Sequence, residues 1–138
     1  MARVMCWGVV CALACGGSAD VGEMREQWSD SAPERYVVKT CNTGFAARVC
    51  NISAVERQQP VLTEEQHAQG TWTPVQPPVD LIGRLFDRAE SATSCERSVT
   101  ADSVYGYPSD VYFNCGEEGS GVEVACFAAD TLELETCR

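Results

Sequence analysis

The most regular pattern of apolar and polar positions lies in the second half of the chain and is that of an amphipathic helix. Ile82, Leu85, Phe86 and Ala89 recur at i, i+3, i+4 and i+7, so they fall on one face of a helix, and charged residues occupy the other face. The spacing predicts a helix over residues 79–93. This is the main helix that we expect.

A weaker helical pattern occurs earlier in the chain. Val21, Met24 and Trp28 have helical spacing, and the charge of Asp20 suits the positive end of a helix dipole. The pattern predicts a short amphipathic helix within residues 19–30, or a tether that leads into one.

Segments rich in β-branched and aromatic residues predict two or three strands before the main helix and three after it. Val122, Val124 and Cys126, for example, alternate with other residues and so share one face of a strand. The connections between these segments are short, which favours antiparallel pairing. The expected strands cover residues 35–41, 45–55, 61–63, 97–104, 111–115 and 122–126, with loops at residues 66–78 and 116–121.

These elements predict an α+β fold, in which one main amphipathic helix packs on a face of a small antiparallel sheet. The chain has 138 residues and a hydrophobic content of 45%, enough to bury the core of one domain. We expect a signal peptide over residues 1–14, a tether and short helix over residues 15–30, and a single α+β domain over residues 31–138.

The formal net charge of −10 narrows the classes of partner. A nucleic-acid-binding protein needs a basic surface, so we expect no nucleic-acid partner. The same charge disfavours electrostatic adhesion to anionic lipid. An excess of carboxylates is typical of a protein that stays soluble outside the cytoplasm.

The first residues of the chain are typical of an export signal. An apolar run of 11 residues from Val4 to Ala14 follows Arg3, and it is too short to span a bilayer. Ala12-Leu13-Ala14 before Cys15 resembles the lipobox of bacterial lipoproteins, in which the cysteine receives a lipid. Ordinary cleavage after Ala14 and cleavage after Gly17-Ser18-Ala19 are the alternatives.

Lipidation at Cys15 would make the membrane a partner through the lipid anchor. Gly16 stands where Asp commonly retains lipoproteins in the inner membrane, so the resemblance favours the outer membrane of the cell envelope. A periplasmic or secreted protein is the alternative location.

Six cysteines follow the signal region, and an even number suits a disulfide framework in an oxidising compartment. Six cysteines allow 15 pairings, of which Cys41–Cys50 is the most local because it could join neighbouring strands. The disulfide candidates are Cys41, Cys50, Cys95, Cys115, Cys126 and Cys137.

Few residues point to catalysis. The single histidine, His67, lies in a polar segment, and the cysteine spacings contain no Cys-x-x-Cys. We therefore expect no metal, no cofactor and no enzymatic activity.

Aromatic residues are concentrated near the end of the chain. Tyr105, Tyr107 and Tyr112 could form a binding surface, because tyrosine offers rigid contact area with one polar group. The other interpretation is that they brace a hairpin and cap a small core.

The order of several of these features resembles an uncharacterised family of exported bacterial domains, many of which are lipoproteins. The resemblance spans roughly residues 24–127. It rests on Trp28, Tyr36-Val37-Val38 and Cys41, on the helix at residues 79–87, and on Tyr105-Gly106-Tyr107-Pro108. It implies the fold and an envelope location, and it implies no activity.

The sequence thus predicts a bacterial envelope lipoprotein that acts as a non-catalytic structural or interaction module. Its partner would be an unknown envelope protein or ligand. The alternative is a secreted ligand-binding or enzyme-inhibitor domain that acts through the aromatic hairpin at residues 105–113.

Overall fold

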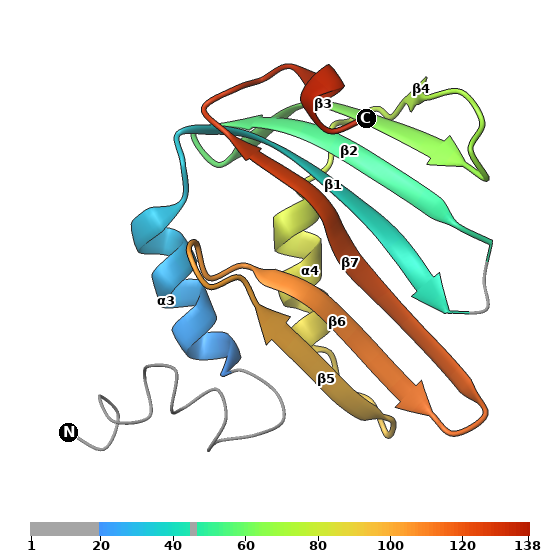
Figure 1. Ribbon diagram of the computed structural model, residues 1–138. Coiled ribbons are helices and arrows are strands. Elements are labelled where there is room, and N and C mark those ends of the chain that lie inside the picture. Colours follow the sequence, from blue (N-terminus) through green and yellow to red (C-terminus); the bar gives the residue numbers. More distant parts are fainter. Residues whose placement is uncertain (1–19, 45–46) are drawn as a thin grey trace.

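The computed structural model describes residues 20–44 and 47–138 (Figure 1). The expected signal peptide and Cys15 lie outside the described residues. The elements, in order, are α3 (Val21–Ser31), β1 (Arg35–Gly44), β2 (Val49–Glu56), β3 (Gln59–His67), β4 (Thr73–Pro74), α4 (Leu81–Glu90), β5 (Glu96–Ala101), β6 (Pro108–Cys115), β7 (Glu118–Ala129) and the 3-10 turn η1 (Leu134–Thr136).

One seven-stranded sheet, in the order β4-β3-β2-β1-β7-β6-β5, dominates the fold. Every neighbouring pair of strands is antiparallel, which confirms the expected pairing. The chain builds β1, β2 and β3 as successive hairpins and then crosses to the opposite edge through α4. It returns through β5 and β6, so that the last strand, β7, lies beside β1 in the middle of the sheet.

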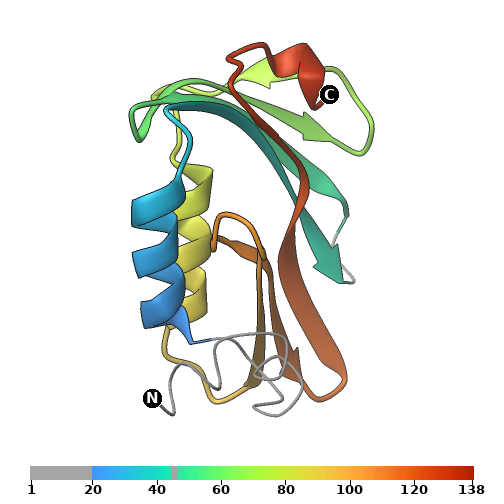
Figure 2. The same ribbon diagram turned by 60° about the vertical axis from the view of Figure 1, so that its left-hand side comes forward.

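The expectation of a small sheet with one main helix is only partly correct. The sheet is large, and α3 lies beside α4 on the same face (Figure 2). Sequence patterns underestimate the sheet because several strands extend into polar segments at its edges. The expected loop at residues 66–78 contains the end of β3 and all of β4, for example.

Both helices begin at an aspartate that caps them. The Asp20 carboxylate accepts a hydrogen bond of 2.8 Å from the Gly22 amide, and the Asp80 carboxylate accepts one of 2.9 Å from the Gly83 amide. Such caps satisfy amides that have no partner within the helix. The helix expected over residues 79–93 is confirmed, with the shorter bounds Leu81–Glu90.

The two helices and the face of the sheet beneath them enclose the main core, which we call the helix-side core. α3 contributes only two buried side chains and α4 contributes five. An ion pair of 2.6 Å between Arg25 and Glu90 joins the two helices at their surface. The buried members are Met24, Trp28, Tyr36, Val38, Val55, Leu81, Ile82, Leu85, Phe86, Ala89, Val99, Tyr107 and Val111.

The other face of the sheet, which we call the outer face, carries a second and much smaller core. Residues 131–138, the C-terminal strap, fold back over this face beside the β3–β4 edge (Figure 1). Leu134 and Cys137 from the strap cover Val37, Ile52 and Ala54 from the sheet. We call the three sheet residues the outer apolar patch.

Candidate functional site

The six cysteines expected to form a framework are joined in three disulfides, and none of them is free. Cys41–Cys50 links β1 to β2, where the two residues are direct partners in the sheet. Cys95–Cys115 joins the start of β5 to the end of β6, and Cys126–Cys137 fastens the strap to β7. The cysteine spacing alone leaves the pairing open, and Cys41–Cys50, its most local candidate, is one of the three bonds formed.

The three candidate tyrosines do not lie together. Tyr107 is only 5% exposed and belongs to the helix-side core. Tyr105 packs against the same core, and both rings contact Phe127, at centroid distances of 5.1 Å for Tyr105 and 4.8 Å for Tyr107. Tyr112 lies on the opposite face of the sheet, because it alternates with Val111 and Phe113 of the helix-side core.

The turn that carries Tyr105 is fixed to α3 by polar contacts. The Asp102 carboxylate accepts a hydrogen bond of 2.8 Å from the Tyr105 amide. Gln27 and Ser31 of α3 donate to the backbone carbonyls of Val104 and Tyr105. Burial first, and then the negative charge of Asp102, raise the pKa of the Tyr107 hydroxyl well above its usual value. This hairpin therefore braces the fold.

Tyr112 has a different setting, because its ring lies on the backbone of the neighbouring strand. A Cβ atom added to Gly121 would lie 2.7 Å from Cδ1 of Tyr112, and one added to Gly119 would overlap the Tyr112 hydroxyl. The two glycines thus make room for the ring. The expected loop at residues 116–121 is corrected accordingly, since β7 already begins at Glu118.

Two carboxylates face each other on the outer face beside Tyr112. Asp110 of β6 and Glu123 of β7 are direct partners in the antiparallel register. Partial burial first, and then the charge of Glu123, raise the pKa of Asp110. Arg48 approaches Glu123 at 4.0 Å and compensates part of this charge. Like charges in directly opposed positions destabilise a sheet.

Asp110 and Glu123 are not recognisable as a pair from the sequence. Each residue lies on the outer face of its strand, and the alternation of apolar and polar residues along the strand is enough to show this. That the two are opposite each other depends on the register between β6 and β7, and the register depends on where the hairpin turns. This hairpin turns at Gly116 and Glu117. The glycine-rich segment around these residues does not show from sequence which two of them form the turn.

The His67 side chain forms a hydrogen bond of 2.7 Å between its Nε2 atom and the carboxylate of Glu65. Its side chain is 65% exposed at the end of β3. No serine, threonine or cysteine side chain in the described part of the chain is hydrogen-bonded to it.

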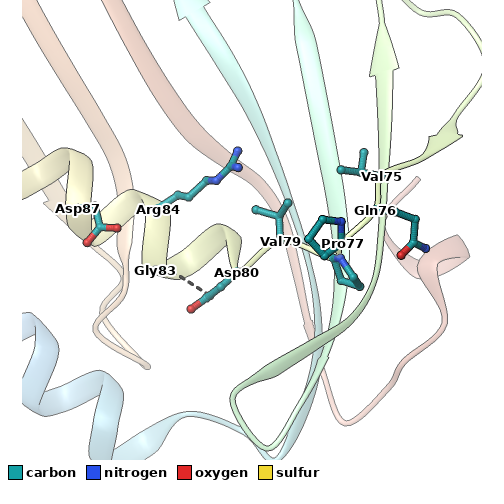
Figure 3. Close-up of a pocket in the computed structure, with 9 residues that line it drawn as sticks. Val75, Gln76, Pro77, Val79, Asp80, Gly83, Arg84 and Asp87 are labelled. Carbon is teal, nitrogen blue, oxygen red and sulfur yellow. Dashed lines mark hydrogen bonds between the residues drawn. The ribbon is translucent and has the colours of Figure 1, made fainter.

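A hollow of about 490 Å³ lies beside the start of α4, as Figure 3 shows. Val75, Pro77 and Val79 supply apolar walls, and Arg84 extends along it from the helix. The hollow is broad and open to solvent. Its aspartates are already engaged: Asp80 caps α4, and Asp87 lies 3.8 Å from Arg25.

Among residues 20–44 and 47–138, no three His, Cys, Asp or Glu side chains are grouped closely enough to hold a metal ion. None of the described helices combines the length and the apolar character needed to cross a membrane. No protein-family model matches the chain, and no curated protein is similar to it in sequence.

Proposed function

We propose that this chain is an exported lipoprotein, held in the cell envelope through a lipid on Cys15, that acts as a non-catalytic interaction module. The observation that carries the proposal is the complete pairing of the six cysteines from Cys41 onward. Three disulfides indicate an oxidising, extracytoplasmic location.

The lipid anchor is supported by the lipobox-like segment before Cys15. The acidic character of the chain adds a physical reason. With a net charge of −10, the domain gains nothing electrostatically from an anionic bilayer, so retention at a membrane would depend on acyl chains.

A non-catalytic role is supported by how the ionisable groups are used. The strongest shifts of pKa belong to Tyr36 and Tyr107, and burial in the core raises both. His67 is exposed and contacts a carboxylate of its own strand. The two tyrosines therefore belong to the core and the histidine to the surface, and these three side chains do not line one cavity.

Contact with a partner would involve the uncovered part of the outer face, over β5, β6 and β7. This area lies away from the strap and on the side opposite the helices (Figure 2). It presents the Tyr112 ring together with Asp110 and Glu123. A tyrosine with flanking carboxylates suits a partner that offers cationic and hydroxyl groups.

Membrane fractionation of a Cys15→Ser variant tests the anchor. We expect the wild-type protein in the membrane fraction and the variant in the soluble extracytoplasmic fraction. A Cys11→Ser variant is the matched control, because it changes a neighbouring cysteine within the signal segment. Equal membrane retention of wild type and Cys15→Ser would refute the anchor.

The alternative, a secreted domain that binds a ligand through its aromatic hairpin, is favoured by the position of Tyr112 alone. Cross-linking in intact envelopes with wild type and Tyr112→Ala tests whether Tyr112 forms part of the contact surface. Loss of a specific cross-linked partner in this variant, with unchanged folding, would support contact through the outer face. Tyr107→Phe is the control, because that side chain is buried.

A further inference from the structure

Side-chain packing and one disulfide attach the C-terminal strap to the domain. Its backbone hydrogen bonds are internal: the Thr136 amide donates to Glu133, and the Cys137 amide donates to Leu134. Before the strap, the Asp130 amide donates to the Arg35 carbonyl. In the described structure, the strap is therefore held on the sheet by side chains and by one disulfide, without pairing to a strand.

The surface under the strap is strongly apolar. Val37 and Ile52 are 0% exposed and Ala54 is 1% exposed, although all three lie on the outer face of the sheet. Leu134 of the strap is buried in the same cluster, and the partly buried Trp72 packs against it. If the strap moved away, the outer apolar patch would face water and would favour any segment with the same chemistry.

The residue immediately before the strap has a strained backbone. Asp130 has a φ of +63°, in the left-handed region that residues other than glycine adopt at a cost in free energy. This conformation turns the chain back over its own sheet. A chain that left Asp130 in an extended conformation would carry its strap away from its own domain without that strain.

We propose that the outer apolar patch is an interface between two copies of this chain, in which each copy's strap covers the patch of the other. The occupant is specified by the structure itself, because the strap already fits the patch within one copy. Exchange of an identical element conserves its contacts and adds only the change at the hinge. In the exchanged dimer, Cys137 of each copy forms its disulfide with Cys126 of the other.

The chemistry of this exchange needs a thiol but no net oxidant. The thiolate of a small thiol, such as glutathione, attacks Cys126, which is partly exposed, while Cys137 is only 4% exposed and leaves as a thiolate. The Cys137 thiolate of the second copy then attacks the mixed disulfide and releases the small thiol. Two bonds within copies become two bonds between copies.

An isotope-mixing experiment tests the proposal. Equal amounts of exported Cys15→Ser protein with natural isotopes and with uniform ¹⁵N are incubated over a range of concentrations with reduced and oxidised glutathione. Thiols are then blocked, mass is measured by light scattering, and disulfide-linked peptides are identified by mass spectrometry. We expect a dimer that increases with concentration and whose Cys126–Cys137 peptides are about half mixed-isotope.

The other disulfides are internal controls. Cys41–Cys50 and Cys95–Cys115 join strands that are already paired, so their peptides should stay unmixed. A protein that remains monomeric at every concentration would overturn the proposal. Mixing to the same extent in all three disulfides would also overturn it, because that result indicates unspecific scrambling.

Two variants sharpen the test. Asp130→Gly removes the strain of the closed hinge, so we expect the dimer dissociation constant to rise by about tenfold. Leu134→Ala weakens strap contacts equally in monomer and dimer, so it should speed the exchange several-fold and leave the equilibrium nearly unchanged. An unchanged dissociation constant in Asp130→Gly, or an unchanged rate in Leu134→Ala, would count against exchange of the strap.

Discussion

The two faces of the sheet are covered in different ways. Among the described residues, thirteen buried side chains form the core between the sheet and the two capped helices, and five form the core between the sheet and the short strap. The helices satisfy their own backbone groups and offer wide apolar stripes, so packing alone can hold them. The strap contributes one 3-10 turn and a few side chains, and it is fastened by Cys126–Cys137. The strap buries less apolar area than the helices do, so its attachment depends more on a covalent bond.

The largest effect should come from a cavity on the helix side. Leu85 is 2% exposed on α4, and Leu85→Ala should lower the free energy of unfolding by about 3 kcal/mol, because the packed core closes only partly around the void. Urea denaturation measures this change. Arg84→Ala on the exposed side of the same helix is the control, with an expected change below about 0.5 kcal/mol. Equal effects of both variants would show that the buried side of α4 does not stabilise the helix-side core.

Removal of the strap disulfide should lower the free energy of unfolding nearly as much as Leu85→Ala does. Its effect on amide exchange should be confined to the strap. Cys126→Ser with Cys137→Ser should lower stability by about 2–3 kcal/mol and increase amide exchange in residues 131–138, while α3 and α4 keep their protection. Hydrogen exchange with mass spectrometry locates the effect. Removal of Cys95 and Cys115 is the comparison, since it should leave exchange in the strap unchanged. Loss of protection in the helices would show that the two faces are not independent.

A smaller effect is expected where Tyr112 rests on β7. Gly121→Ala places a methyl group 2.5 Å from the Thr43 hydroxyl and 2.7 Å from the Tyr112 ring, and it should destabilise the domain by about 1–2 kcal/mol. In a Tyr112→Ala background the same substitution should cost less, because the ring is gone. Thermal unfolding of the four proteins gives the coupling. An absence of coupling would mean that the packing of the Tyr112 ring does not depend on a glycine at position 121.

The smallest effect concerns the facing carboxylates. The raised pKa of Asp110 means that the folded state binds its proton more tightly than the unfolded chain does, so this group favours folding most at low pH. That contribution is lost as the pH rises through the raised pKa. Asp110→Asn should therefore stabilise the domain at neutral pH by less than about 1 kcal/mol and give no gain in acid. Urea midpoints at several pH values measure this difference, and a gain that persists in acid would contradict it.

Much of the helix-side fold follows from sequence patterns. The main helix is predictable from Ile82, Leu85, Phe86 and Ala89, since their spacing reflects burial on one face. Antiparallel pairing is predictable from short connections. The packing of α3 is harder to predict, because only Met24 and Trp28 mark its buried side and the rest of the helix is polar.

The outer face is much less predictable, for physical reasons. β7 reads as a loop at Gly119 and Gly121, because their role depends on a tyrosine of another strand. The tyrosine cluster is contiguous in sequence, yet alternation along β6 places Tyr112 on the other face from Tyr105 and Tyr107. The number of disulfides was predictable from the cysteine count, whereas Cys126–Cys137 required the reversal of the chain at Asp130.

The position of β7 beside β1 has a consequence for how this chain acquires its shape. Val38 pairs with Phe127, 89 residues further along, so the middle of the sheet closes only after β7 has been synthesised. Contacts so distant in sequence form slowly, since a long loop must close first. A nascent chain with this topology leaves one edge of β1 without its partner strand until β7 emerges, so the sheet would still be incomplete during passage through a narrow translocation channel.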